Sequence, residues 1–97
     1  MNFHKSKAWL SKREKILRRD EYLCQECKRY GKTTAANTVH HIYPIALRPS
    51  LRLLSVNLIS LCPKCHNEMH DRVTDELTAK GLKWVERIKD SIPPTLK

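Results

Sequence analysis

Residues 61–70 read LCPKCHNEMH and place two cysteines and two histidines within nine positions. All four side chains are common metal ligands. If this stretch enters a helix, neighbouring residues point about 100° apart, whereas residues three or four apart share a face. His66 and His70 are then neighbours on one face, and Cys62 and Cys65 are neighbours on another. Because Cys65 and His66 diverge, one tetrahedral ion is poorly placed to bind both, and the sequence predicts two separate sites.

The cysteine pair has its partners earlier in the chain, in the sequence CQEC at Cys24 and Cys27. The four cysteines of the chain thus form two C-x-x-C pairs. The opening residues MNFHKSKAWL are polar and charged where a secretory signal is apolar, so we expect a reducing compartment in which cysteines bind metal and form no disulfides. Four thiolates at about 2.3 Å make a closed structural zinc site. The two histidines remain for a second ion.

Length and charge limit the class of protein. The 97 residues suffice for one small domain, 1–97, in which a structural metal compensates for a limited core. Lys and Arg number 19 against 10 for Asp and Glu, a net charge of +9, and the pI is about 9.7. Such a surface indicates an acidic partner, most commonly nucleic acid, although a well-solvated basic surface has the same composition. No apolar run approaches the roughly 20 residues of a membrane span, so we expect no membrane partner.

The spacing of apolar residues predicts a helix near each end of the chain. The N-terminal helix is expected at about 6–20, and an amphipathic C-terminal helix at about 75–92, which Gly81 breaks or delays. Between them, NTVHHI and NLISL suit two short strands joined by the loop YPIALRPSLRLLSV, and CPKCHNEMHDRV reads as a knuckle that runs into a helix. Trp9 and Trp84 are expected in one hydrophobic cluster around the zinc, with base stacking as the alternative role.

Two adjacent histidines, His40 and His41, lie among the 34 residues between the cysteine pairs. A zinc finger with two cysteines and two histidines has to be considered, since twelve residues separate Cys27 from His40. It fails because PIA, at 44–46, stands where the second histidine is needed.

A strand–strand–helix metal site explains the same histidines better. Side chains alternate along a strand, so the two adjacent histidines face opposite sides. One of them can join His66 and His70 on an ion, and the other can face a substrate. Three imidazoles leave coordination positions open, as a catalytic metal requires.

The sequences VHHIYPI and NLISLCPKCHNEMH, preceded by W…R…ILRRDEYLCQECKRYG, resemble the HNH (His-Asn-His) nucleases, and in particular their small zinc-containing bacteriophage members. The resemblance covers about residues 9–70. It implies a small α+β fold: a ββα-metal core at about 20–72 that carries a four-cysteine structural zinc, flanked by the two terminal helices.

The resemblance also implies roles for individual residues. His41 is implied to be the general base, and Asn57 to hold the strand that carries it through hydrogen bonds across the loop. The catalytic ion is implied to be bound by His40, His66 and His70, and the structural zinc by Cys24, Cys27, Cys62 and Cys65. Many family members have Asp at the position of His40. The all-imidazole set favours softer ions, which leaves Mg²⁺, Mn²⁺, Ni²⁺ and Zn²⁺ as alternatives for the catalytic ion.

The implied activity is hydrolysis of double-stranded DNA, one strand at a time, giving a 5′-phosphate and a 3′-hydroxyl with little sequence specificity. The resemblance further implies a phage-encoded protein that acts in the cytoplasm of the infected bacterium, with the packaging terminase and portal proteins as partners. A zinc-stapled nucleic-acid-binding module without catalysis is the alternative from another class, and RNA is an alternative substrate. The basic residues expected to meet phosphates are Lys12, Arg13, Arg48, Arg52 and Lys64.

Overall fold

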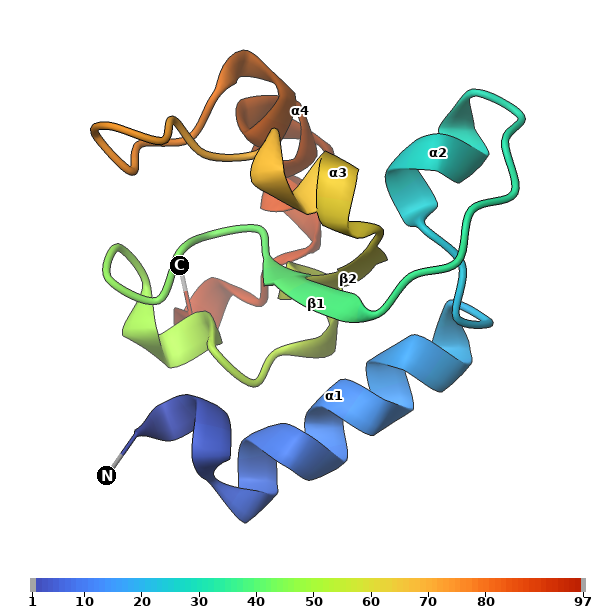
Figure 1. Cartoon of the computed structure of the whole chain (residues 1–97). Coiled ribbons are helices and arrows are strands. Elements are labelled where there is room, and N and C mark those ends of the chain that lie inside the picture. The colour runs from blue at the N-terminus through green and yellow to red at the C-terminus, as the bar shows by residue number, and fades with distance from the viewer. Residues whose placement is uncertain (1, 97) are drawn as a thin grey trace.

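A computed structural model describes residues 2–96 of the chain, which form a small α+β fold as predicted (Figure 1). Two antiparallel strands lie in the middle, with α1 on one side of them and α3 on the other. In chain order the elements are η1 (Phe3–Lys5), α1 (Lys7–Arg19), α2 (Gln25–Arg29), β1 (Thr38–His41), η2 (Pro49–Leu51), η3 (Ser55–Asn57), β2 (Leu58–Leu61), α3 (Pro63–Asn67), α4 (Ala79–Ile88), η4 (Lys89–Ser91) and η5 (Pro94–Leu96).

The register of the two strands decides which side chains face which helix. His40 pairs with Ile59, and His41 pairs with Leu58. Directly opposed residues of an antiparallel pair share a face, and successive residues alternate. His40 therefore lies on the α3 side of the sheet, while His41 lies on the α1 side.

The outer edge of β2 is closed by side chains from the end of α1. The Asp20 carboxylate accepts a hydrogen bond from the backbone N–H of Ser60, at 3.0 Å. Arg19 binds that carboxylate at 2.8 Å and also donates to the carbonyl of Leu58, at 2.7 Å. These two side chains satisfy backbone groups that a third strand would otherwise pair, because buried peptide groups need partners.

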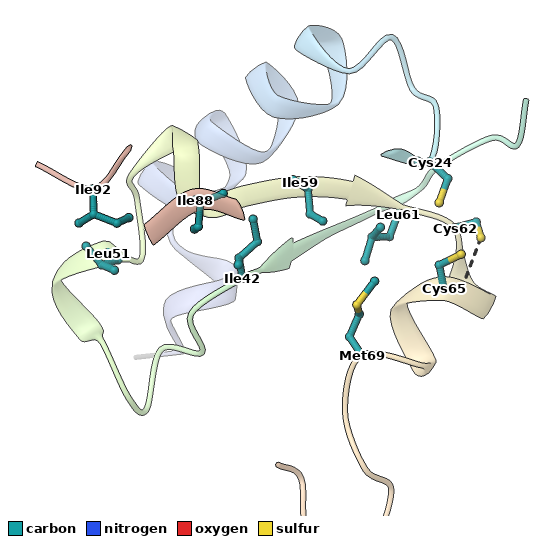
Figure 2. Close-up of a cluster of buried hydrophobic side chains, with 11 residues drawn as sticks. Cys24, Ile42, Leu51, Ile59, Leu61, Cys62, Cys65, Met69, Ile88 and Ile92 are labelled. Carbon is teal, nitrogen blue, oxygen red and sulfur yellow. Dashed lines mark hydrogen bonds between the residues drawn. The ribbon is translucent and has the colours of Figure 1, made fainter. Parts of the chain in front are cut away.

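Two hydrophobic clusters cover the two faces of the sheet. On the α1 side, Trp9, Ile16 and Leu17 pack with Val39 and Leu58. On the other side the cluster contains three of the cysteines (Figure 2). Trp84 packs against this second cluster. Its other buried members are Ala36, Ile42, Leu51, Ile59, Leu61, Met69, Ile88 and Ile92. The expectation that both tryptophans join one cluster around the zinc is therefore wrong, because α1 and α4 pack on opposite faces.

The helix that follows the second knuckle is shorter than the histidine spacing suggested. It ends at Asn67, and His70 lies beyond it, in an isolated bridge with Leu77. The chain leaves the helix because the Met69 carbonyl accepts from the N–H of Thr78, at 2.9 Å. His66 and His70 therefore come from a helix and from the strand-like segment after it.

The C-terminal helix begins at Ala79, because Asp75 has a left-handed backbone (φ 63°) and Thr78 caps the helix through Gly81 N–H. Gly81 lies inside α4 and does not break it. A Cβ at this position would stand 2.6 Å from the carbonyl oxygen of Met69, so glycine permits α4 to pack directly on the segment that carries His70. None of the helices in the described part of the chain is long and apolar enough to cross a membrane.

Gly81→Ala should lower the stability of the fold, although alanine favours a helix. The added methyl group meets a backbone oxygen, and overpacking of this kind costs about 1–3 kcal/mol. Helix propensity returns up to about 1 kcal/mol. Thermal unfolding should show a lower midpoint for Gly81→Ala. Lys83→Ala, at an exposed position of the same helix, should leave it unchanged. A melting temperature at or above that of the wild type would contradict the close approach.

Candidate functional site

The four cysteines converge at one end of the sheet, as predicted. Cys24 and Cys62 each cap a short helix, accepting at Sγ from the N–H of the cysteine three residues later, at 3.5 Å. All four Sγ atoms lie within 4.8 Å of one another, with Cys27 at 4.0 Å from Cys62 and 3.7 Å from Cys65. A tetrahedron with metal–sulfur bonds of about 2.3 Å has edges of about 3.8 Å. The cluster therefore fits a zinc ion.

The four thiols form no disulfide, and burial disfavours the thiolate form of two of them, Cys24 and Cys65. Burial raises the pKa of Cys24 and, more strongly, the pKa of Cys65. A bound cation would lower the pKa of these thiols, because the thiolate is the form that binds metal. Figure 2 shows Cys24, Cys62 and Cys65 grouped at the edge of the apolar cluster, next to Leu61 and Met69.

A second group of potential ligands is centred on His40. Its ring centroid lies 5.6 Å from that of His66 and 5.4 Å from that of His70. His40 is only 1% exposed, and its Nε2 has no hydrogen-bond partner among residues 2–96. A buried nitrogen without a partner is costly unless something else binds it. Imidazole nitrogens suit divalent transition metals such as Ni²⁺ and Zn²⁺. Among the described residues, however, only the four cysteines bring their ligand atoms within 4.8 Å of one another, so the three imidazoles are grouped more loosely than the thiols.

The protonation of His40 and His66 agrees with metal binding. Burial lowers the pKa of His40 to about 3, helped by repulsion from the neighbouring histidines. Burial also lowers the pKa of His66, with a smaller contribution from His70. Neutral imidazole is the form that binds metal.

His41 lies on the other side of the strand and has different surroundings. Its ring stacks on Trp9 with centroids 4.7 Å apart and an interplanar angle of 26°. Its Nε2–H donates to the carbonyl of Arg52, at 3.0 Å, which leaves the Nδ1 lone pair free to accept a proton. Burial lowers the pKa of His41, while the Arg52 carbonyl acts in the opposite direction. The result is a neutral, oriented imidazole.

Asn57 closes the loop between the two strands. Its Oδ1 accepts from Tyr43 N–H at 2.7 Å, and its Nδ2 donates to the carbonyls of Tyr43 and Leu51, both at 3.2 Å. The side chain is fully buried. Its backbone carbonyl also accepts from Ile42 N–H at 2.9 Å. These bonds fix the chain directly after the two strand histidines.

A single cleft of about 470 Å³ joins both groups of histidines. Its lining contains His40, His41, His66 and His70, which the sequence singled out, and also His4 and Asp75, which it did not. His4 lies in no motif, and only the packing of the N-terminal segment brings it to the cleft. The full lining is His4, Trp9, Arg13, Asn37, Thr38, Val39, His40, His41, Pro44, Ile45, Ala46, His66, His70 and Asp75.

Of the basic residues expected to meet phosphates, Arg13 lines this cleft and the other four do not. Arg13 donates from Nη2 to the carbonyl of Asn37, at 2.6 Å. Lys12 points toward the β1–β2 loop and donates to the hydroxyl of Ser55, at 2.9 Å.

The remaining three candidates are spread over the surface. Arg48 lies over the ring of Tyr43, 5.4 Å from its centroid, and Arg52 lies over Phe3 at 6.0 Å. Lys64 lies in α3, beside the cysteine cluster. Their contact with a nucleic acid stays a prediction.

The family model of the HNH endonucleases matches residues 24–72, half of the chain and the whole span from Cys24 to His70. The chain belongs to the HNH endonuclease family. Its structure is similar to the crystal structure of the HNH endonuclease of the deep-sea thermophilic bacteriophage GVE2 with a manganese ion, with a TM-score of 0.66 and 45% sequence identity. The match covers 67% of this chain and 71% of the phage chain. No curated protein matches the sequence.

Cys62→Ser should remove bound zinc and destabilise the HNH domain. In zinc peptides the metal supplies on the order of 10 kcal/mol of apparent binding energy, which becomes folding energy. Elemental analysis of the purified protein and thermal unfolding test this. Met69→Leu is the control, because it changes packing in the same cluster but removes no ligand, and a volume-conserving exchange costs less than about 1.5 kcal/mol. A zinc-free Cys62→Ser protein that melts like the wild type would refute the four-cysteine site.

Proposed function

We propose that this HNH protein is a metal-dependent endonuclease that hydrolyses phosphodiester bonds of double-stranded DNA, one strand at a time. One observation carries the proposal: a single cleft contains a ligand set on one side of β1 and an oriented, neutral imidazole on the other. Hydrolysis of a phosphodiester needs a base for the attacking water and a cation for the leaving oxygen.

In this proposal His40, His66 and His70 would hold the catalytic ion. The ion, when bound, supplies Lewis-acid stabilisation of the charge that develops on the leaving oxygen. The orphaned Nε2 of His40 supports this assignment. The all-imidazole set favours softer ions such as Ni²⁺ or Zn²⁺, with Mn²⁺ and Mg²⁺ as the alternatives. The manganese ion named in the GVE2 structure supports a divalent cation.

His41 would act as the general base. Its Nδ1 takes a proton from the attacking water, and its Nε2–H bond to Arg52 holds the tautomer and stabilises the imidazolium that forms. Trp9 keeps the ring plane fixed through stacking. Asn57 would hold the loop that follows His41, so that the base keeps its position relative to the ion. The products would carry a 5′-phosphate and a 3′-hydroxyl.

The four cysteines would hold a structural zinc. The domain would bind DNA mainly through its positive charge, with little sequence specificity. The phage origin of the structural relative supports a phage-encoded enzyme that acts in the host cytoplasm. Terminase and portal proteins are the proposed partners there. A plasmid assay with and without added divalent ion, repeated with an RNA duplex, separates this function from a binding module without catalysis and from a ribonuclease.

His40→Ala and His41→Ala should separate in their effects although the residues are adjacent. Loss of the base in His41→Ala should reduce the cleavage rate by roughly 10²–10⁴ and leave metal affinity intact. His40→Ala should weaken binding of the catalytic ion, so that excess Mn²⁺ restores part of its activity. Cleavage rates over a Mn²⁺ titration distinguish the two. If excess metal rescued His41→Ala and not His40→Ala, the assigned roles would be reversed.

Supercoiled plasmid should become open circle first, and linear DNA should follow after a lag. The chain holds one His-Asn-His set, hence one site that hydrolyses one strand per encounter. Gel analysis of a time course at low enzyme concentration measures the order of products. Linear DNA without an open-circle precursor would mean that two sites act together, as in a dimer.

A further inference from the structure

His4 is the one histidine of the chain that the proposed mechanism leaves without a role. It lies in η1 and lines the same cleft as His41, with the two ring centroids 5.9 Å apart and the rings nearly perpendicular. The side chain is exposed, and its ring nitrogens have no hydrogen-bond partner within residues 2–96. Two polar nitrogens therefore remain available at the wall of the cleft.

The N-terminal segment is held firmly enough to position this ring. The Asn2 side chain accepts from His4 N–H at 2.9 Å, and the Ser6 hydroxyl donates to the Phe3 carbonyl at 2.7 Å. The His4 ring meets Trp9 edge-on, at 5.6 Å between centroids. Phe3 packs against the cluster under α1, and the guanidinium of Arg52 lies over its ring.

Arg13 adds a permanent cation to the same wall. It lies four residues after Trp9 in α1, so both side chains share a helix face, and both line the cleft. Its bond to the Asn37 carbonyl uses Nη2, and its other guanidinium nitrogens have no acceptor in the described chain. His4 and Arg13 come from elements on the α1 side of the sheet, whereas His66 and His70 come from the opposite side (Figure 1).

We infer that His4 and Arg13 form a phosphate-binding subsite for the DNA backbone, on the side of His41 away from the metal histidines. The inference rests on the proposed nuclease function. Arg and imidazole N–H groups are good donors to phosphate oxygens. A general base lies about 2.6–3.2 Å from the water that it activates. The ring centroid of His4 lies 5.9 Å from that of His41. In this proposal His4 therefore contacts a neighbouring phosphate of the same strand, and not the phosphate under attack. The subsite positions the strand across His41.

The variants for the test keep most of the bulk of the wall, and each removes one property needed for phosphate binding. His4→Phe preserves the edge-on ring packing without the nitrogens, and Arg13→Gln removes the charge. Lys5→Ala is the matched control, because Lys5 is an exposed cation of the same short helix and lies outside the cleft lining.

The first measurement is the affinity for a fluorescent DNA duplex without added divalent ion. His4→Phe and Arg13→Gln should each weaken binding about tenfold, the size of a hydrogen bond to a charged group. Arg13→Gln should also reduce the log–log salt slope by about 0.9, the contribution of one phosphate. Lys5→Ala should change the affinity much less. Wild-type affinity in both cleft variants would overturn the inference.

The second measurement compares hydrolysis of DNA with hydrolysis of bis(4-nitrophenyl) phosphate, in the presence of Mn²⁺. The small substrate has one phosphate and cannot occupy a second subsite. The ratio of kcat/KM for DNA to kcat/KM for the small substrate should fall about tenfold in His4→Phe. An unchanged ratio with a lower rate on both would mean that His4 acts through His41, which overturns the inference. If the wild type hydrolysed neither substrate while the variants still bound DNA weakly, the nuclease function would fail and the subsite would stand.

Discussion

The alternation of side chains along β1 separates the proposed metal ligands from the proposed general base, and the rest of the candidate site depends on it. His40 and His41 are consecutive, yet one faces α3 and the other faces α1. A slip of one residue in the strand register would exchange their faces and place His41 on the side of His66 and His70. The register is held by groups at both ends of β2. Asn57 closes the loop before it, and Cys62 ties its far end to the cysteine cluster.

This arrangement explains how so small a chain can hold a defined site. Each strand has four residues, and a two-stranded sheet is marginal by itself. The sheet is stabilised by packing against α1 on one face and against the cluster that contains the cysteines on the other. A zinc ion at the four cysteines would therefore fix the start of α3, and through it the position of His66. The cysteine cluster and the group of three histidines have different donor atoms, but both depend on the short segment that leads from β2 into α3.

Local spacing made it predictable which cysteines and histidines would lie together. The two C-x-x-C pairs and the doublet at His40 and His41 have fixed geometry within a few residues, so the cysteine cluster and the opposite faces of the doublet followed from the sequence. The point at which α3 ends could not be predicted from the sequence. It depends on the hydrogen bond from Thr78 N–H to the Met69 carbonyl, which is made by a later part of the chain. The position of His4 could not be predicted either, because only tertiary packing brings it to the cleft. The same holds for Gly81, which allows α4 to lie close to the backbone of Met69.

The closure of one sheet edge by Arg19 and Asp20 has a consequence for how other molecules approach. With the β2 edge occupied, a strand from another chain has no ladder to extend on that side, which protects the protein from edge-to-edge association. Residues 37–41 all line the cleft, although successive side chains of β1 point in opposite directions. The cleft must therefore run along the outer edge of β1. A bound molecule there meets peptide groups as well as side chains, and peptide groups are the same whatever amino acid is mutated.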